Sequence, residues 1–231
     1  MNLSLKIALL TLSLATTTSV YAQSKFEGPF VQGALGYTNV SPTFDETITL
    51  SNQTRHPQNI SAENLSVFTG NIAAGYSFRV APQWLLAVSV DYMPTASGSA
   101  KTNVSFPNVS GLNGLNGSYQ MKNPYNFSVI PGYELSMNQV LYGKVAYTGA
   151  TVVYSDSVIP ATEVKMSGYT IGLGYKQALD NQLYVFAEGL YTKFEDKTAS
   201  TNGAYSGGLI NSSLTAGASG FTALVGAGYR F

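Results

Sequence analysis

Eight segments of this chain alternate between apolar residues and small or polar ones with a period of two, the period of a β-strand. We expect strands over residues 29–39, 66–79, 84–94, 125–136, 140–153, 164–177, 183–194 and 221–231. The connections alternate in length. Those at 80–83, 137–139 and 178–182 are short, whereas those at 40–65, 95–124, 154–163 and 195–220 are long. This succession predicts an all-β fold made of antiparallel hairpins.

The alternation divides each strand between two faces of different composition. In the segment 84–94 one face carries Trp84, Val88 and Tyr92, while the other carries Ser89 and Asp91. The lumen of an eight-stranded barrel is only about wide enough for its own side chains, so the many aromatic rings would overfill it. We therefore expect the aromatic face to point outward, with rings gathered in two girdles near the strand ends, and the small and polar face to line the lumen. A soluble barrel would reverse the two faces.

The N-terminus has the features of an export signal. Lys6 precedes the apolar run Ile7 to Leu14, and Val20-Tyr21-Ala22 matches a small-residue cleavage pattern. We predict a signal peptide over residues 1–22 and a barrel domain over residues 23–231. No later segment has the 18 or more consecutive apolar residues of a transmembrane helix, and a closed barrel is the other structure that satisfies its backbone within lipid.

The low charge content supports a membrane location, because only 10% of residues are charged, against roughly 25% in soluble domains. Together these features predict an eight-stranded antiparallel up-and-down transmembrane β-barrel in a bacterial outer membrane. Both termini are expected in the periplasm, with the long connections outside.

Two strands contain residues that test this interpretation. In 183–194, hydrophobicity alone slightly favours Phe186 and Leu190 facing lipid, but that phase would put Glu188 in lipid at a cost on the order of one to a few kcal/mol. We therefore place Glu188 inside, with Phe186 and Leu190 filling the lumen. Pro131 stands in mid-strand and cannot donate to the hydrogen-bond ladder. It predicts a bulge or a local break.

Charged side chains on the inward face form the first candidate site. They are Arg79, Asp91, Glu134, Lys144, Lys176, Glu188 and Arg230. Buried charges persist only when they are paired or hydrated, so we expect a salt-bridged network centred on Glu134, Lys144 and Glu188. Such a network either braces and closes a non-conducting barrel or acts as a gate for water and small ions. The narrow lumen favours the first interpretation.

Other site chemistries find little support. The chain has no Cys and a single His, which excludes cysteine ligands and multi-histidine metal sites. A hydrolytic enzyme needs a base beside a nucleophile or water. The only histidine, His56, stands in the first long connection without a serine-nucleophile motif. The formal net charge of zero gives no support for nucleic acid. We expect no catalytic, cofactor or metal site.

The last strand, Phe221–Phe231, resembles the C-terminal signal of outer-membrane barrels, with Phe221, Val225, Tyr229 and the terminal Phe231 in one phase. The opening Gly28–Tyr37 resembles the first strand of the small OmpA/OmpX-like, opacity-type outer-membrane β-barrel family, and the resemblance extends over the whole mature chain. It implies that the barrel-assembly machinery recognises the C-terminal strand and that periplasmic chaperones escort the chain. We expect a monomer.

The long connections are rich in Ser, Thr, Asn and Gly, most clearly in the repeat at 111–117, which predicts mobile loops. The first functional hypothesis is a structural or surface-interaction barrel whose loops contact a host or surface ligand, set among outer-membrane lipid and lipopolysaccharide. Lys101 and Lys122 fit lipopolysaccharide phosphates, although loop lysines are more often simply solvated. The alternative is a narrow porin-like channel for water, ions or small solutes, and an outer-membrane enzyme is less favoured.

Overall fold

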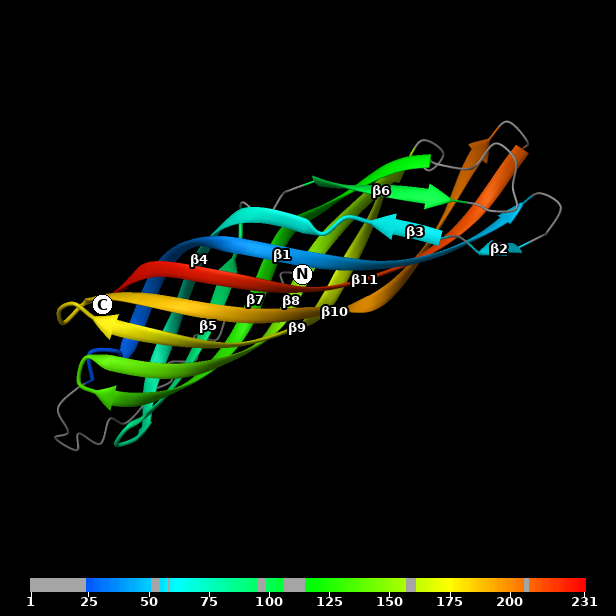
Figure 1. Cartoon of the computed structure of the whole chain (residues 1–231). Coiled ribbons are helices and arrows are strands. Elements are labelled where there is room, and N and C mark those ends of the chain that lie inside the picture. The colour runs from blue at the N-terminus through cyan, green and yellow to red at the C-terminus, as the bar shows by residue number, and fades with distance from the viewer. Residues whose placement is uncertain are drawn as a thin grey trace, which may run out of the picture.

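The computed structural model describes residues 24–50, 55–57, 59–94, 99–105, 115–156, 161–205 and 208–231. Eight long antiparallel strands form a closed ring (Figure 1). They are β1 (Gly28–Leu50), β4 (Leu65–Ala81), β5 (Trp84–Tyr92), β7 (Leu115–Ser136), β8 (Gln139–Asp156), β9 (Thr162–Ala178), β10 (Leu183–Tyr205) and β11 (Gly208–Arg230). Three short strands, β2 (Arg55–Pro57), β3 (Asn59–Ala62) and β6 (Ser99–Ser105), are added at one end. The predicted eight-stranded barrel is confirmed, whereas the predicted signal peptide lies outside the described residues.

Each strand pairs with its neighbour in the ring, and β11 closes it against β1. The short turns after β4, β7 and β9 lie at one end of the barrel, which we call the turn end, and the opposite end is the loop end. The C-terminus also lies at the turn end, where Phe231 N donates to Pro29 O at 3.0 Å. Within the described residues there is no helix that could cross a membrane.

The two faces of the wall are assigned as the alternation predicts. Val88 is 45% exposed on the outside, whereas its neighbour Ser89 is 7% exposed inside. Outward rings form two girdles. The loop-end girdle contains Tyr37, Phe68, Tyr92, Tyr125, Tyr147, Tyr169, Tyr191 and Phe221, and the turn-end girdle contains Tyr76, Phe78, Trp84, Tyr133, Tyr175, Tyr229 and Phe231. Ten residues separate Phe221 from Phe231. At about 3.3 Å per residue and a tilt of about 40°, they span roughly 25 Å, the height of an outer-membrane apolar band.

The two test strands have clear outcomes. Glu188 faces the lumen at 5% exposure, and Phe186 and Leu190 are buried beside it, as expected. Around Pro131 the β7–β8 pairing stops after Val129↔Val145 and resumes at Gly132↔Tyr142 in the same register. The proline therefore causes a local break without a bulge, because its nitrogen has no hydrogen to donate.

The strands continue far into the connections that were expected to be mobile loops, and that expectation is wrong for most of their length. β1 runs to Leu50, and β10 and β11 occupy 195–205 and 208–220. These segments are rich in Ser and Thr but keep the period of two, with Leu214, Ala216 and Ala218 buried on one face. Of the repeat at 111–117, residues 115–117 lie in β7 and the rest falls outside the described residues.

At the loop end the ring opens along two seams. The last described β9–β10 pair is Gly168↔Phe194, and the last β1–β4 pair is Val40↔Leu65. Beyond them β1, β2, β10 and β11 form one sheet, and β3, β6, β7, β8 and β9 form another (Figure 1). We call these two sheets together the head. Phe44 of the first sheet packs on Tyr119 and Tyr154 of the second, with centroid distances of 5.5 and 5.9 Å.

A buried apolar cluster fills the space between the two sheets of the head. Its members are Val40, Leu65, Ala100, Tyr119, Met121, Ala150, Val152, Tyr154, Val164, Met166, Phe194, Leu214 and Ala218. A cavity of about 10 Å³ is lined by residues of both sheets, so this part of the head is a packed β-sandwich rather than an open funnel. Burial also raises the pKa of Tyr119 to about 12. Its hydroxyl donates to Glu63 O at 2.7 Å.

Candidate functional site

The middle of the lumen is occupied by a buried ion cluster. Lys144 of β8 lies between Asp91 of β5 and Glu188 of β10, with Nζ 2.6 Å from Asp91 Oδ2 and 3.5 Å from Glu188 Oε1. All three side chains are at most 2% exposed. Ser128 Oγ donates to Asp91 Oδ2 at 3.1 Å. Such charges are stable inside a barrel only because each one is paired and hydrogen-bonded. The cluster links three strands that are not neighbours in the ring.

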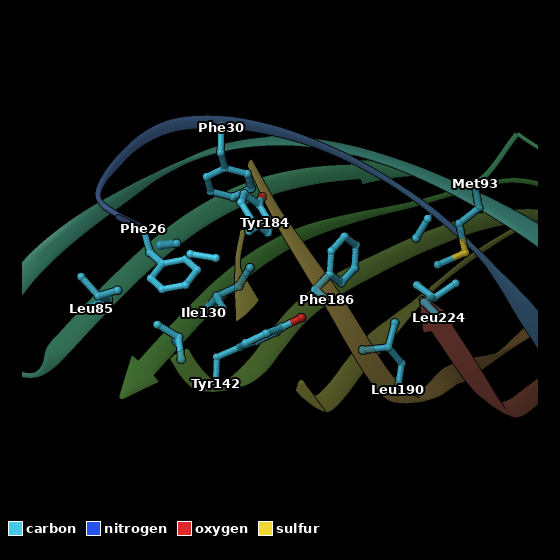
Figure 2. Packing of buried hydrophobic residues seen from close by; sticks show 14 residues of the cluster. Phe26, Phe30, Leu85, Met93, Ile130, Tyr142, Tyr184, Phe186, Leu190 and Leu224 are labelled. Atoms are coloured by element: carbon cyan, nitrogen blue, oxygen red, sulfur yellow. The ribbon is translucent and has the colours of Figure 1, made fainter. Parts of the chain in front are cut away.

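A second layer of aromatic rings lies toward the turn end. The Lys176 ammonium stands over the rings of Phe30, Tyr142 and Tyr184, at 4.7, 5.2 and 4.9 Å from their centroids. This is the geometry of cation–π attraction. Figure 2 shows the rings of Phe30, Tyr142 and Tyr184 gathered in the interior. Among the ion pairs of the described residues none includes Lys176, so the rings are its main partners.

Glycines make room for these rings. Tyr142 faces Gly174 on the next strand, and Tyr184 faces Gly228. A Cβ at either glycine would lie 2.2 Å from the facing ring, which no real side chain tolerates. The small residues of the inward face are therefore needed to fit large ones across from them.

The four residues that precede β1, Ser24–Glu27, lie across the turn end, and we call them the N-terminal latch. Glu27 pairs with Arg79 at 3.3 Å, and Arg79 also binds Glu134 at 2.9 Å. Ser24 Oγ donates to Glu134, and the latch ring Phe26 is 7% exposed and lies 6.2 Å from Tyr184 (Figure 2). The chain passes from the latch into β1 through Gly28, whose φ of +116° suits glycine. Sequence reasoning missed the latch because four residues show no periodicity.

The seven inward charges therefore separate into groups. The structure brings together Asp91, Lys144 and Glu188, and separately Arg79 and Glu134. Arg230 lies apart and donates to the carbonyl oxygens of Asn181 and Glu27.

The expectation that Glu134 shares a centre with Lys144 is wrong. The pair Gly132↔Tyr142 fixes the hairpin register, which puts Lys144 opposite Ile130. Glu134 is thus four residues, or about 13 Å of strand, nearer the turn.

A belt of hydroxyl groups crosses the lumen between the ion cluster and the head. Asn126, Thr148, Thr170 and Thr192 stand on four successive strands and are linked by side-chain hydrogen bonds of 2.6 Å. Thr38 and Thr222 continue the belt at 3.0 Å. These side chains satisfy one another's hydrogen-bonding groups at the height where the polar lumen meets the apolar core of the head.

The residues of the predicted assembly signal and the single histidine complete the candidate sites. Phe221 and Val225 are 68 and 65% exposed on the outer face of β11, where Tyr229 is partly exposed, and Phe231, directly after the strand, is 64% exposed. Their role as an assembly signal stays a prediction. His56 lies in β2, paired in register with Ile48. In the described part of the chain, no three His, Asp or Glu side chains lie close enough to hold a metal ion.

No family model and no curated protein sequence matches the chain, but solved structures do. The outer membrane protein OprG from Pseudomonas aeruginosa aligns with a TM-score of 0.61 and 15% identity, over 90% of this chain and 99% of OprG. The outer membrane protease OmpT from Escherichia coli aligns with a TM-score of 0.56 and 10% identity, over 93% of this chain and 100% of OmpT. At these identities the likeness concerns the fold and carries no activity with it. The chain has the fold of the bacterial outer-membrane β-barrel proteins, the class that its OmpA/OmpX-like sequence features indicate.

Proposed function

We propose that the protein is a non-conducting barrel of the bacterial outer membrane that holds its head outside the cell as an interaction surface. The turn end and both termini face the periplasm in this proposal. The observation that carries it is the combination of a lumen occupied by the ion cluster and the aromatic layer with a wall that continues into a packed head. The buried carboxylates Asp91 and Glu188 are engaged by Lys144, and no catalytic role is proposed for them.

The side chains that occupy the lumen support a role in holding the barrel wall rather than in gating a channel. A solute moving along the axis meets the packed head, then the ion cluster, then the aromatic layer and latch. A buried charge that is left without its partner costs about 3–5 kcal/mol, so parting Lys144 from Asp91 and Glu188 without new partners is unfavourable. The lumen of an eight-stranded barrel leaves little room beyond its side chains. The inward charges are therefore proposed to fill the lumen as paired groups rather than to form a gate.

The head supports an interaction role because it is structured before it meets a partner. β1 continues thirteen residues from Tyr37 to Leu50, which is about 40 Å of strand. Its outward residues there, Ser41, Thr43 and Asp45, are polar and exposed. A rigid surface loses less conformational entropy on binding than mobile loops do. The ligand is proposed to lie on a host cell or another surface, and the barrel itself to be a monomer among lipid and lipopolysaccharide, assembled by the barrel-assembly machinery.

A variant that lacks the β10–β11 part of the head, which we call the headless variant, tests the interaction role. Replacing residues 195–217 by Asn-Gly joins the paired residues Phe194 and Ala218 through two residues and leaves the membrane wall intact. Asn-Gly suits a two-residue hairpin turn. Bacteria that display equal amounts of heat-modifiable wild-type or headless protein are compared for attachment to epithelial cells and to abiotic surfaces. We expect attachment to fall for the headless protein. Equal attachment on every surface would refute the interaction role.

Planar-bilayer recording tests the closed lumen independently. The wild-type protein is expected to give no steady conductance, and so is Lys144→Ala, because the head and the latch remain. A reproducible wild-type conductance would favour the alternative, a narrow channel for water, ions or small solutes.

A further inference from the structure

Three lysines lie on the outer face of the barrel just beyond the loop-end girdle. They are Lys122 of β7, Lys165 of β9 and Lys193 of β10, and we call them the lysine arc. Lys122 and Lys165 are joined in register through Thr151, so their backbones are about 10 Å apart, two strand spacings. Lys193 is paired with the girdle residue Tyr169. All three point away from the lumen, and the Lys122 side chain is 42% exposed.

The height of the arc matches the headgroup region of a lipid leaflet. Lys193 stands two residues beyond Tyr191, Lys122 three residues before Tyr125, and Lys165 four residues before Tyr169. With the rise and tilt of barrel strands, these steps put the lysines roughly 5–10 Å above the girdle. Tyrosine and tryptophan rings mark the membrane–water interface. The lysine ammonium groups therefore lie where lipid phosphates are found.

Nearby carboxylates leave the arc positively charged. Glu163 lies 4.0 Å from Lys122, while Glu195 pairs at 3.6 Å with Lys197, outside the arc. Three lysines against the single Glu163 leave a net charge of 3 − 1 = +2.

The turn end has no group of three lysines in the described residues. It has Lys25 and two arginines that are engaged elsewhere, Arg79 with Glu27 and Glu134, and Arg230 with carbonyl oxygens. The two rims of the barrel thus differ in their capacity to attract anions.

We propose that the lysine arc binds the phosphate groups of lipopolysaccharide in the leaflet around the loop end. Lysine ammonium groups form charge-assisted hydrogen bonds to phosphate, and Thr151 adds a hydroxyl between two of them. The proposal rests on the proposed function for its orientation, since it requires the loop end to lie in the outer leaflet.

Affinity for lipopolysaccharide in detergent micelles tests the arc, and it does not depend on orientation. The triple variant Lys122→Gln/Lys165→Gln/Lys193→Gln is expected to bind about tenfold more weakly than wild type. Glu163→Gln should bind more tightly. The control Lys25→Gln/Lys101→Gln removes two lysines outside the arc, leaves the Glu195–Lys197 pair in place, and should bind as wild type does. Enzymatically dephosphorylated lipopolysaccharide should bind the wild type as weakly as intact lipopolysaccharide binds the triple variant.

Three outcomes would overturn the lysine arc as a lipid site: unchanged affinity of the triple variant, full affinity for dephosphorylated lipopolysaccharide, or displacement by millimolar inorganic phosphate, which would indicate a free-phosphate site. Labelling a cysteine introduced at the exposed Thr198 of the head in intact cells separates this result from the proposed function. If that cysteine is protected from a membrane-impermeant reagent, the proposed orientation fails even where the micelle assay succeeds.

Discussion

Replacing Lys144 by methionine is the sharpest test of the lumen. Methionine keeps the length of the side chain and removes its charge. Asp91 and Glu188 would then remain in the interior, with side-chain exposures of 0 and 2%, without the cation that pairs them. Removing one partner of a buried ion pair costs about 3–5 kcal/mol. We expect the free energy of unfolding of Lys144→Met to fall by about that amount.

A neutral variant of the lumen supplies the control. Lys144 of the ion cluster and Lys176 of the neighbouring aromatic layer together balance the two acids Asp91 and Glu188, so neutralising all four leaves no unpaired charge. The variant Asp91→Asn/Lys144→Met/Lys176→Met/Glu188→Gln keeps similar volumes. It should be more stable than Lys144→Met and within about 1–2 kcal/mol of wild type, because well-packed neutral groups often replace buried ion pairs at little cost.

Urea unfolding in lipid vesicles measures both variants. The only tryptophan, Trp84, lies in the turn-end girdle at 50% exposure and reports transfer from lipid to water by its fluorescence. If Lys144→Met lost less than about 1 kcal/mol, or if the neutral variant were as unstable as the single one, pairing would not be what keeps these charges inside.

Three further predictions concern the latch, the head and one turn. Phe26→Ala removes a buried ring and should lower stability by about 3 kcal/mol, while Lys25→Ala should change it by less than about 0.5 kcal/mol; equal effects in urea titrations would contradict a packed latch. Phe44→Ala should speed proteolysis of the head while the barrel stays heat-modifiable, and unchanged proteolysis would argue against the sandwich. Backbone N–H groups of Leu183 and Gln182 donate to the Asp180 carboxylate and lower its pKa. These hydrogen bonds therefore stabilise the folded wild type fully above the ordinary Asp pKa of about 3.9. The stabilisation is lost as the pH falls through the lower pKa of Asp180 in the folded protein. The advantage over Asp180→Ala should therefore shrink in that acidic window, and a pH-independent difference would contradict this account.

The sequence predicts features that depend on one residue or one strand, and it does not predict features that depend on how distant strands are aligned. Phe186 and Leu190 could be placed inside because the charge of Glu188 outweighed their hydrophobicity. The break at Pro131 could be predicted because a missing N–H is a property of one residue. The pairing of Glu134 with Arg79 was not predicted, because it depends on the stagger of strands far apart in the sequence.

The sequence by itself determined the wall of this protein: its eight principal strands, its inward and outward faces, its girdles and the charges in its lumen. These are consequences of a period of two and of the cost of placing charge in lipid, and both act on single strands. The tertiary structure alone decided which charged side chains lie at the same level of the lumen, and how Ser24–Glu27 lies across the turn end. It also decided that the Ser- and Thr-rich ends of the strands pack as a β-sandwich. Each of these needs a partner from another strand, since Arg79, Tyr184 and Phe44 find their contacts only after the ring has closed.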